Sequence, residues 1–199
     1  MKLFSKDTMF TRSIKFIRRF PLSFMIAALA IGSLSIPVID QVDVYFSSNK
    51  FCASSCHEME STVYKELQSS THWTTSTGVR AGCADCHVSE RLVPAMWDHF
   101  LGMKELIVHI TSDVSKQGNF DKNYRAETAN RVRMRMLEND SKNCRTCHDM
   151  RAIKPERKRG QRLHTQASEK KTTCIVCHYD LVHKEVEPSA EFLKAIDSQ

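Results

Sequence analysis

The sequence predicts a mainly α-helical protein with much loop, in which one N-terminal transmembrane helix precedes an exported domain. Three observations lead to this fold class. Glycine (6) and proline (5) are scarce among the 199 residues, and apolar residues rarely alternate with polar ones, which disfavours a sheet. One long uncharged stretch lies near the N-terminus. All eight cysteines follow it, in four pairs.

The N-terminal part predicts a membrane anchor. Residues 1–20 carry six lysines and arginines against one aspartate and are expected to remain in the cytoplasm. Residues 21–39 contain no charge, and a helix of that length just spans the roughly 30 Å hydrocarbon core. Residues 40–199 are then expected in the periplasm, outside a bacterial inner membrane that the chain crosses once.

A cleaved signal peptide is the alternative to an anchor. Ala28, Leu29 and Ala30 have the small-x-small form of a cleavage site. The apolar stretch continues well past that site, which favours a helix that stays in the membrane. In either case the cysteine-rich part is exported.

Four cysteine motifs organise the rest of the chain. Three of them read Cys-x-x-Cys-His, and the first has one more residue between its cysteines. This pattern is typical of covalent haem c attachment, in which two thiols bind the haem and the next histidine ligates its iron. The attachment cysteines are Cys52, Cys56, Cys83, Cys86, Cys144, Cys147, Cys174 and Cys177, and the motif histidines are His57, His87, His148 and His178.

Structural zinc or four disulfides are weaker interpretations of the same cysteines. Neither explains why a histidine follows the second cysteine of every pair. Neither requires every cysteine of the chain to belong to such a pair. We therefore expect four covalently bound haems.

The spacing of the motifs predicts two dihaem halves. The first two motifs begin 31 residues apart (52 to 83) and the last two 30 residues apart (144 to 174), with 61 residues between the pairs. Such self-similarity indicates a duplicated dihaem unit. Because each haem adds two propionates, the formal charge of +6 overstates the basicity of the loaded protein, and we infer no nucleic-acid partner.

Three further segments lie between the motifs. Apolar residues at helical spacing predict a helix over 93–110, which either packs on haems or lies at the membrane surface beside a quinol. Residues 126–137 predict a connecting helix of mixed charge. Residues 151–171 are polar and basic and are expected to form a solvated loop that meets haem propionates, with docking of an acidic partner as the alternative.

Five histidines lie outside the motifs and are candidates for the second iron ligand: His72, His99, His109, His164 and His183. His72 follows its motif histidine by 15 residues and His164 by 16, so a duplication makes the two equivalent. His183 follows His178 by only five residues and reaches a neighbouring haem more easily than its own. His99 and His109 are less favoured as iron ligands. Met59 is a further candidate, because methionine also ligates haem iron.

These residues together resemble the NapC/NirT family of membrane-anchored tetrahaem cytochromes c. The resemblance covers nearly the whole chain. It is carried by the anchor and by FCASSCHEM at 51–59, THW at 71–73, GVRAGCADCHV at 78–88 and TCIVCHYDLVH at 173–183.

The resemblance implies a function in anaerobic respiration. Members of this family oxidise membrane quinol and pass electrons to periplasmic reductases for nitrate, nitrite or trimethylamine oxide. Glu105 corresponds to an acidic residue near haem 1, and His99 stands where a lysine near the quinol is common. Both are therefore candidates for the quinol site.

The resemblance also implies a set of iron ligands. Met59 would ligate haem 1 in place of His57, although the extra residue in the first motif keeps both as candidates. The distal ligands would be His164 for haem 2, His183 for haem 3 and His72 for haem 4.

Two other functions compete with quinol oxidation. A passive anchored relay would take its electrons from another redox protein, and residues 93–110 would then be scaffold. A terminal reductase would instead turn over a small oxyanion at haem 1. Direct reduction by quinol, dependence on a protein donor, and turnover of nitrite or hydroxylamine distinguish the three.

Overall fold

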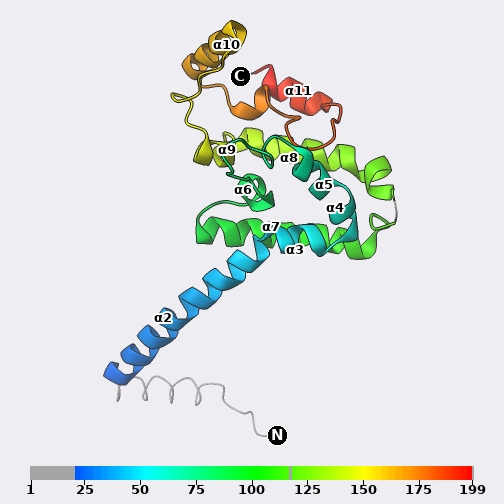
Figure 1. Ribbon diagram of the computed structural model, residues 1–199. Helices are drawn as coiled ribbons and strands as arrows, with labels where there is room; N and C mark the ends of the chain where they lie inside the picture. Colours follow the sequence, from blue (N-terminus) through cyan, green and yellow to red (C-terminus); the bar gives the residue numbers. More distant parts are fainter. Residues whose placement is uncertain (1–20, 117, 199) are drawn as a thin grey trace, which may run out of the picture. The chain divides into compact units, whose positions relative to one another are not determined.

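The computed structural model describes residues 21–116 and 118–198, and it divides the chain into two compact units, Met1–Val44 and Tyr45–Gln199 (Figure 1). The basic segment 1–20, predicted to be cytoplasmic, lies outside the described residues. Each unit is considered by itself.

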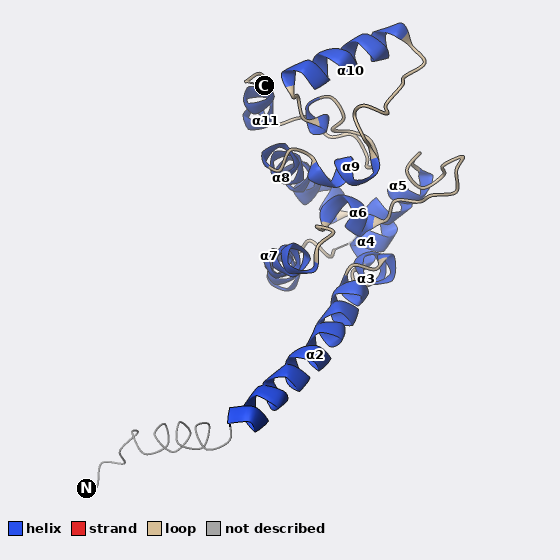
Figure 2. Cartoon of the chain, turned by 90° about the vertical axis from the view of Figure 1, so that its left-hand side faces the viewer, coloured by secondary structure: helices blue, strands red, loops and turns tan. Residues whose placement is uncertain are grey.

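The predicted membrane anchor forms one long helix, α2, over Pro21–Phe46 (Figure 2). The helix is longer than the predicted 21–39, because Asp40 and Asp43 are accommodated within it and it ends only before the cap of the next helix. Pro37 also lies inside the helix. With a mean hydropathy of 2.2 and no buried residue, α2 is long and apolar enough to cross a membrane.

The second unit is built from short helices and loops, and no strand occurs in the described residues. Ser48 caps the first of these helices by accepting a hydrogen bond from the amide of Phe51. The elements are α3 (Asn49–Ser54), α4 (His57–Ser61), α5 (Val63–Ser69), α6 (Cys83–His87), α7 (Leu92–Thr111), η1 (Phe120–Tyr124), α8 (Arg125–Glu138), α9 (Lys142–Cys147), α10 (Lys158–Lys170), η2 (Cys174–Val176) and α11 (Ala190–Ile196). The predicted mainly α-helical class with much loop is confirmed.

The helices predicted over 93–110 and 126–137 are confirmed as α7 and α8, each within one residue of the predicted ends. The loop predicted over 151–171 is wrong in its second part, which forms α10. Lysine, arginine, glutamine, leucine, alanine and glutamate dominate α10 and have high helix propensity. The segment is not recognisable as helical from the sequence because it contains only two apolar residues, Leu163 and Ala167.

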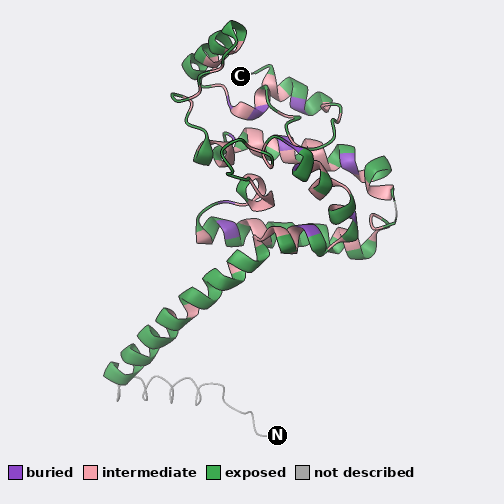
Figure 3. Cartoon of the chain, in the orientation of Figure 1, coloured by how far each residue is buried: buried purple, intermediate pink, exposed green. Residues whose placement is uncertain are grey.

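Few apolar side chains are buried in the second unit (Figure 3). The buried ones in the described residues are Ala53, Leu67, Ala95, Ile175 and Phe192. A core this small contributes little hydrophobic stabilisation to a domain of this length. Bound groups with large apolar surfaces are therefore expected to contribute to its stability.

Candidate haem sites

Each cysteine motif lies on a short helical segment. The second motif coincides with α6, the third begins inside α9, and the fourth begins with the 3-10 turn η2. The first motif differs because its extra residue divides it between two helices. Cys52 lies in α3, and Cys56 precedes α4 in an extended conformation.

Neighbouring motifs lie next to one another. The first lies beside the second and the third beside the fourth, and Asn143, just before the third motif, also donates a hydrogen bond of 2.6 Å to the carbonyl of Val88, just after the second. The neighbouring thiol of Cys83 lowers the pKa of Cys52 to about 7, and the Cys52 thiol raises the pKa of Cys83. The Cys144 thiol likewise lowers the pKa of Cys174 to about 6, and the Cys174 thiol raises the pKa of Cys144. The first and second motifs are thus adjacent, and so are the third and fourth.

Polar contacts hold the motifs of each pair together. In the first pair, Asn49 Oδ1 accepts a hydrogen bond of 2.9 Å from the amide of Cys83. Gly82 permits this approach, because a Cβ atom there would lie 2.6 Å from the same oxygen. In the second pair, the buried Ser141 Oγ accepts hydrogen bonds from the Thr173 hydroxyl (2.8 Å) and the Ile175 amide (3.1 Å).

Three histidines from outside the motifs face three motif histidines. The ring centroids of His72 and His148 lie 6.3 Å apart. Those of His87 and His183 are also 6.3 Å apart, and those of His164 and His178 are 6.0 Å apart. Each pair therefore joins one motif to a second segment of the chain.

The facing rings suit a metal held between them. Imidazole nitrogens bind metal ions at about 2 Å, so two rings that share one iron have centres about 6 Å apart. His72 Nδ1 is buried without a hydrogen-bond partner in the described structure, which is unusual for a ring nitrogen unless a metal binds it. Burial lowers the pKa of His87 to about 4, so its ring is neutral and able to ligate at neutral pH.

The pairs differ from those that the family resemblance implied. His72 faces the third motif, whereas the resemblance implied the fourth. His183 faces the second motif and not the third. His164 faces the fourth motif and not the second. For His164 the reason is α10, which was expected to be a loop. Lys171, with φ 56°, turns the chain at the end of α10, and the fourth motif begins three residues later.

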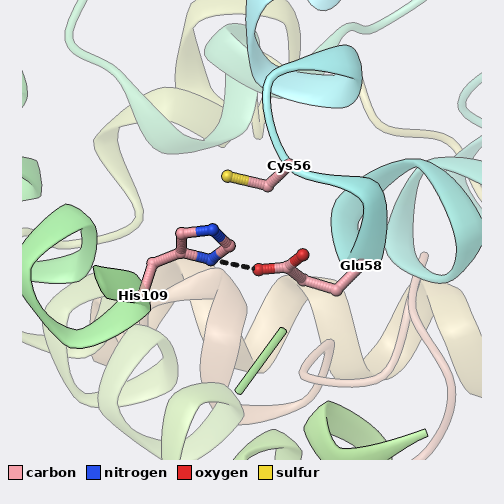
Figure 4. A group of neighbouring side chains, drawn as sticks. All are labelled: Cys56, Glu58 and His109. Atoms are coloured by element: carbon pink, nitrogen blue, oxygen red, sulfur yellow. Dashed lines mark ion pairs between the residues drawn. The ribbon is translucent and has the colours of Figure 1, made fainter. Parts of the chain in front are cut away.

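The first motif has a different environment, in which Glu58 contacts His109 (Figure 4) and also His57. Its carboxylate is 2.6 Å from His109 Nδ1 of α7 and 3.2 Å from His57 Nδ1. Glu58 is 8% exposed, whereas the His57 side chain is 63% exposed. Cys56 completes the group, with its thiol near the Glu58 carboxylate and the His109 ring.

Sequence reasoning did not single out Glu58 and gave His109 little weight. A signal for His109 existed, because Asp98, Gly102, Glu105 and His109 follow one another at helical spacing. The structure turns members of this stripe toward the domain. Asp98 accepts hydrogen bonds from the amide (2.8 Å) and hydroxyl (2.5 Å) of Ser89.

The two residues expected at a quinol site lie on the same helix, α7. His99 Nε2 is 3.1 Å from the Ser47 hydroxyl, and its ring lies 6.0 Å from that of Phe46. Glu105 forms an ion pair of 3.2 Å with Arg131 of α8, and its side chain is about half exposed. His109, on the same helix, contacts Glu58, which directly follows the first motif.

The comparison with known families fits this arrangement. The model of the NapC/NirT cytochrome c family, N-terminal region, matches residues 17–188. The chain belongs to the NapC/NirT cytochrome c family. Membership makes this protein a c-type cytochrome with covalently bound haem, and together with α2 it supports a single-pass protein of the inner membrane.

Several known proteins resemble this NapC/NirT cytochrome over most of its length. The cytochrome c-type protein NapC of Escherichia coli K12 is 36% identical over 149 residues, which are 71% of this chain and 74% of NapC. The denitrification system component NirT of Stutzerimonas stutzeri is 35% identical over 144 residues (69% and 68%). A probable tetraheme cytochrome c-type protein of Nitrosomonas europaea is 34% identical over 166 residues (81% and 69%). No solved structure matches the chain.

Proposed function

We propose that this NapC/NirT cytochrome holds four haems, oxidises membrane quinol and passes the electrons to a periplasmic terminal reductase. The observation that carries the proposal is the set of three facing histidine pairs, each with one member directly after a cysteine pair. Bis-histidine ligation is suited to electron transfer because both axial positions of the iron are occupied. The tetraheme and denitrification names of the relatives agree with this function.

The facing pairs suggest the ligands of three haems. His87 and His183 would hold haem 2, His148 and His72 haem 3, and His178 and His164 haem 4. When bound, these haems supply one-electron oxidation and reduction at iron. The adjacent motifs within each half would keep successive haems close together.

Haem 1 would be the one that meets quinol. Its ligand is His57 or Met59, and within residues 21–116 and 118–198 no other histidine ring faces that of His57. An accessible haem suits a site that must admit a substrate from the membrane. The exposed side chain of His57 supports such access.

Quinol loses two protons together with its two electrons, so the site needs bases near the first motif. His109 Nδ1 and the Glu58 carboxylate form a contact there that can hold and move a proton. Glu105 lies about one turn, and His99 about three turns, before His109 on α7. Both are further acceptors that would lead protons toward the periplasm. Histidine and a partly buried carboxylate can both titrate near neutral pH.

The orientation of α7 supports access from the membrane. Its polar residues Asp98, His99 and His109 make contacts within the domain. Its large apolar residues point to solvent: Val93, Met96, Trp97, Phe100, Leu101, Met103, Leu106, Ile107 and Ile110. An apolar face of this extent is typical of a helix that lies in the membrane interface.

Anaerobic reduction of the purified full-length protein by a quinol analogue tests this function. Without any other protein, the quinol should promptly reduce part of the haem α-band, and a quinone-site inhibitor should block the reduction. If neither a menaquinol nor a ubiquinol analogue reduces the protein while dithionite reduces all four haems, the passive relay is the correct function.

A further inference from the structure

Glu66 of α5 lies at the centre of a contact network that includes a proposed iron ligand. Its Oε2 atom is 3.4 Å from His183 Nδ1 and accepts a hydrogen bond of 3.1 Å from the amide of Lys184. The same carboxylate accepts two hydrogen bonds from Arg125, at 2.8 and 3.0 Å. Glu66 therefore contacts both the ring of His183 and the main chain of the next residue.

Arg125 fixes the position of this carboxylate. Its guanidinium is almost fully buried and is shared between Glu66 and Asp121, whose carboxylate lies 2.6 Å from Nη2. A bidentate arginine–carboxylate pair restricts both the distance and the orientation of the two groups. Glu66 is thus held in place independently of His183.

We propose that Glu66 is a positioning residue that orients His183 toward the iron of haem 2 and lowers the reduction potential of that haem. The inference rests on the proposed pairing of His183 with His87. A carboxylate beside the second ring nitrogen of a metal-bound histidine fixes the ring and increases its basicity. A more basic ligand stabilises ferric over ferrous iron, which lowers the potential.

The other proposed ligands of the three bis-histidine haems lack such a carboxylate in the described structure. His164 Nδ1 pairs instead with the main-chain oxygen of Gly160, one turn earlier in α10, at 2.8 Å. A neutral carbonyl increases the basicity of the ring less than a carboxylate does. Haem 2 should therefore be the bis-histidine haem whose potential depends most on a side chain outside the ligand set.

The test replaces Glu66 by glutamine, with Asp121→Asn as the matched control. Each variant removes one carboxylate from Arg125, and only the first changes the partner of His183. We would measure haem content by pyridine haemochrome, redox titration curves of the full-length protein in detergent, and electron paramagnetic resonance (EPR) of the oxidised protein. Glu66→Gln should retain four haems, shift one midpoint potential to a more positive value and change the g-values of one low-spin signal.

The control separates the ligand effect from a loss of charge. An equal positive shift in Asp121→Asn, or no shift in Glu66→Gln, would overturn the proposal. If Glu66→Gln does not accumulate with four haems, Glu66→Asp keeps the charge, withdraws it from the ring and should show a smaller positive shift.

A His183→Ala variant distinguishes this inference from the proposed function. It should convert one low-spin haem to high-spin. If that conversion occurs while Glu66→Gln is unaltered, His183 is a ligand and only the role of Glu66 is wrong. If His183→Ala keeps all three low-spin signals of the bis-histidine haems, the ligand pairing itself fails.

Discussion

The rings of His72 and His148 face each other at 6.3 Å and are nearly perpendicular, with an interplanar angle of 79°. The other two pairs are closer to parallel, at 29° for His87 and His183 and 34° for His164 and His178. Perpendicular axial imidazoles leave two d orbitals of ferric iron almost equal in energy, whereas parallel rings separate them. The three bis-histidine haems should therefore differ in their EPR spectra.

We expect one strongly anisotropic low-spin signal from haem 3 and two rhombic low-spin signals from haems 2 and 4. The His72→Ala variant should lose the anisotropic signal and gain a high-spin one, because it removes a ligand of haem 3. The His183→Ala variant should lose a rhombic signal instead. Loss of the same signal in both variants would contradict the ligand pairs.

The ligand pairs also show how far sequence reasoning extends in this protein. The motifs define which histidines follow each cysteine pair. Sequence spacing favoured His72, His164 and His183 over His99 and His109, and these three rings are the ones that face motif histidines in the described structure. Sequence spacing does not define which motif each one faces, since that depends on the path of the loops. The turn at Lys171, a residue with a left-handed conformation that no local pattern predicts, directs α10 back to the fourth motif.

A helix was predictable where apolar residues recur at helical spacing, even if the structure leaves them exposed. The ends of α7 followed from such spacing, whereas α10 has only two apolar residues and was predicted to be a loop. The apolar stripe of α7 predicted a helix but did not show whether the stripe faces the interior of the domain or points outward. Contacts of Asp98 and His109 with the domain are needed to show that the apolar residues point outward.

Substitution of Gly82 tests the contact between the first two motifs. A Cβ atom at Gly82 would lie 2.6 Å from Asn49 Oδ1, so Gly82→Ala must displace the acceptor of the Cys83 amide. We expect a loss of about 1 kcal/mol of stability, the net contribution of a typical hydrogen bond, because the Asn49 side chain can move aside. Thermal unfolding followed by circular dichroism gives the measurement. Gly102→Ala is the control, because nothing lies near its Cβ and alanine favours a helix.

Substitution of Glu58 tests where quinol protons are accepted. Glu58→Gln removes the charge that faces His57 and His109, and should slow quinol oxidation roughly 100-fold, a value typical of lost general-base catalysis. Glu105→Gln should also slow the reaction, but less, because Glu105 is half exposed and pairs with Arg131. Stopped-flow reduction by a quinol analogue gives both rates. Unchanged rates with four haems attached would exclude the corresponding residue from the site.

Substitution of Arg133 tests how the C-terminal segment is held in place. It is 4% exposed and donates hydrogen bonds to Asp180 (2.6 Å), the Val186 carbonyl (2.7 Å) and Asn130 (3.0 Å). Arg133→Met keeps the aliphatic volume but leaves Asp180 without its cation. We expect a loss of about 2–3 kcal/mol, since hydrogen bonds to charged groups contribute that much. Arg131→Met, on the exposed side of α8, should change the unfolding temperature far less.

The outward face of α7 gives the most direct test of membrane contact. Burying its apolar side chains in lipid would remove them from water, and each such side chain contributes about 1.5–3 kcal/mol when fully buried. Trp97 and Phe100 stack at 5.4 Å on this face, and aromatic residues favour the membrane interface. The full-length protein in nanodiscs with a photoactivatable lipid should therefore form adducts at Trp97, Phe100 and Ile107. The exposed residues of α8 serve as the internal control, because that helix is polar and should remain unlabelled. Equal labelling of α7 and α8, or labelling confined to α2, would mean that α7 faces water or a protein partner, and quinol would then need another route to the first motif.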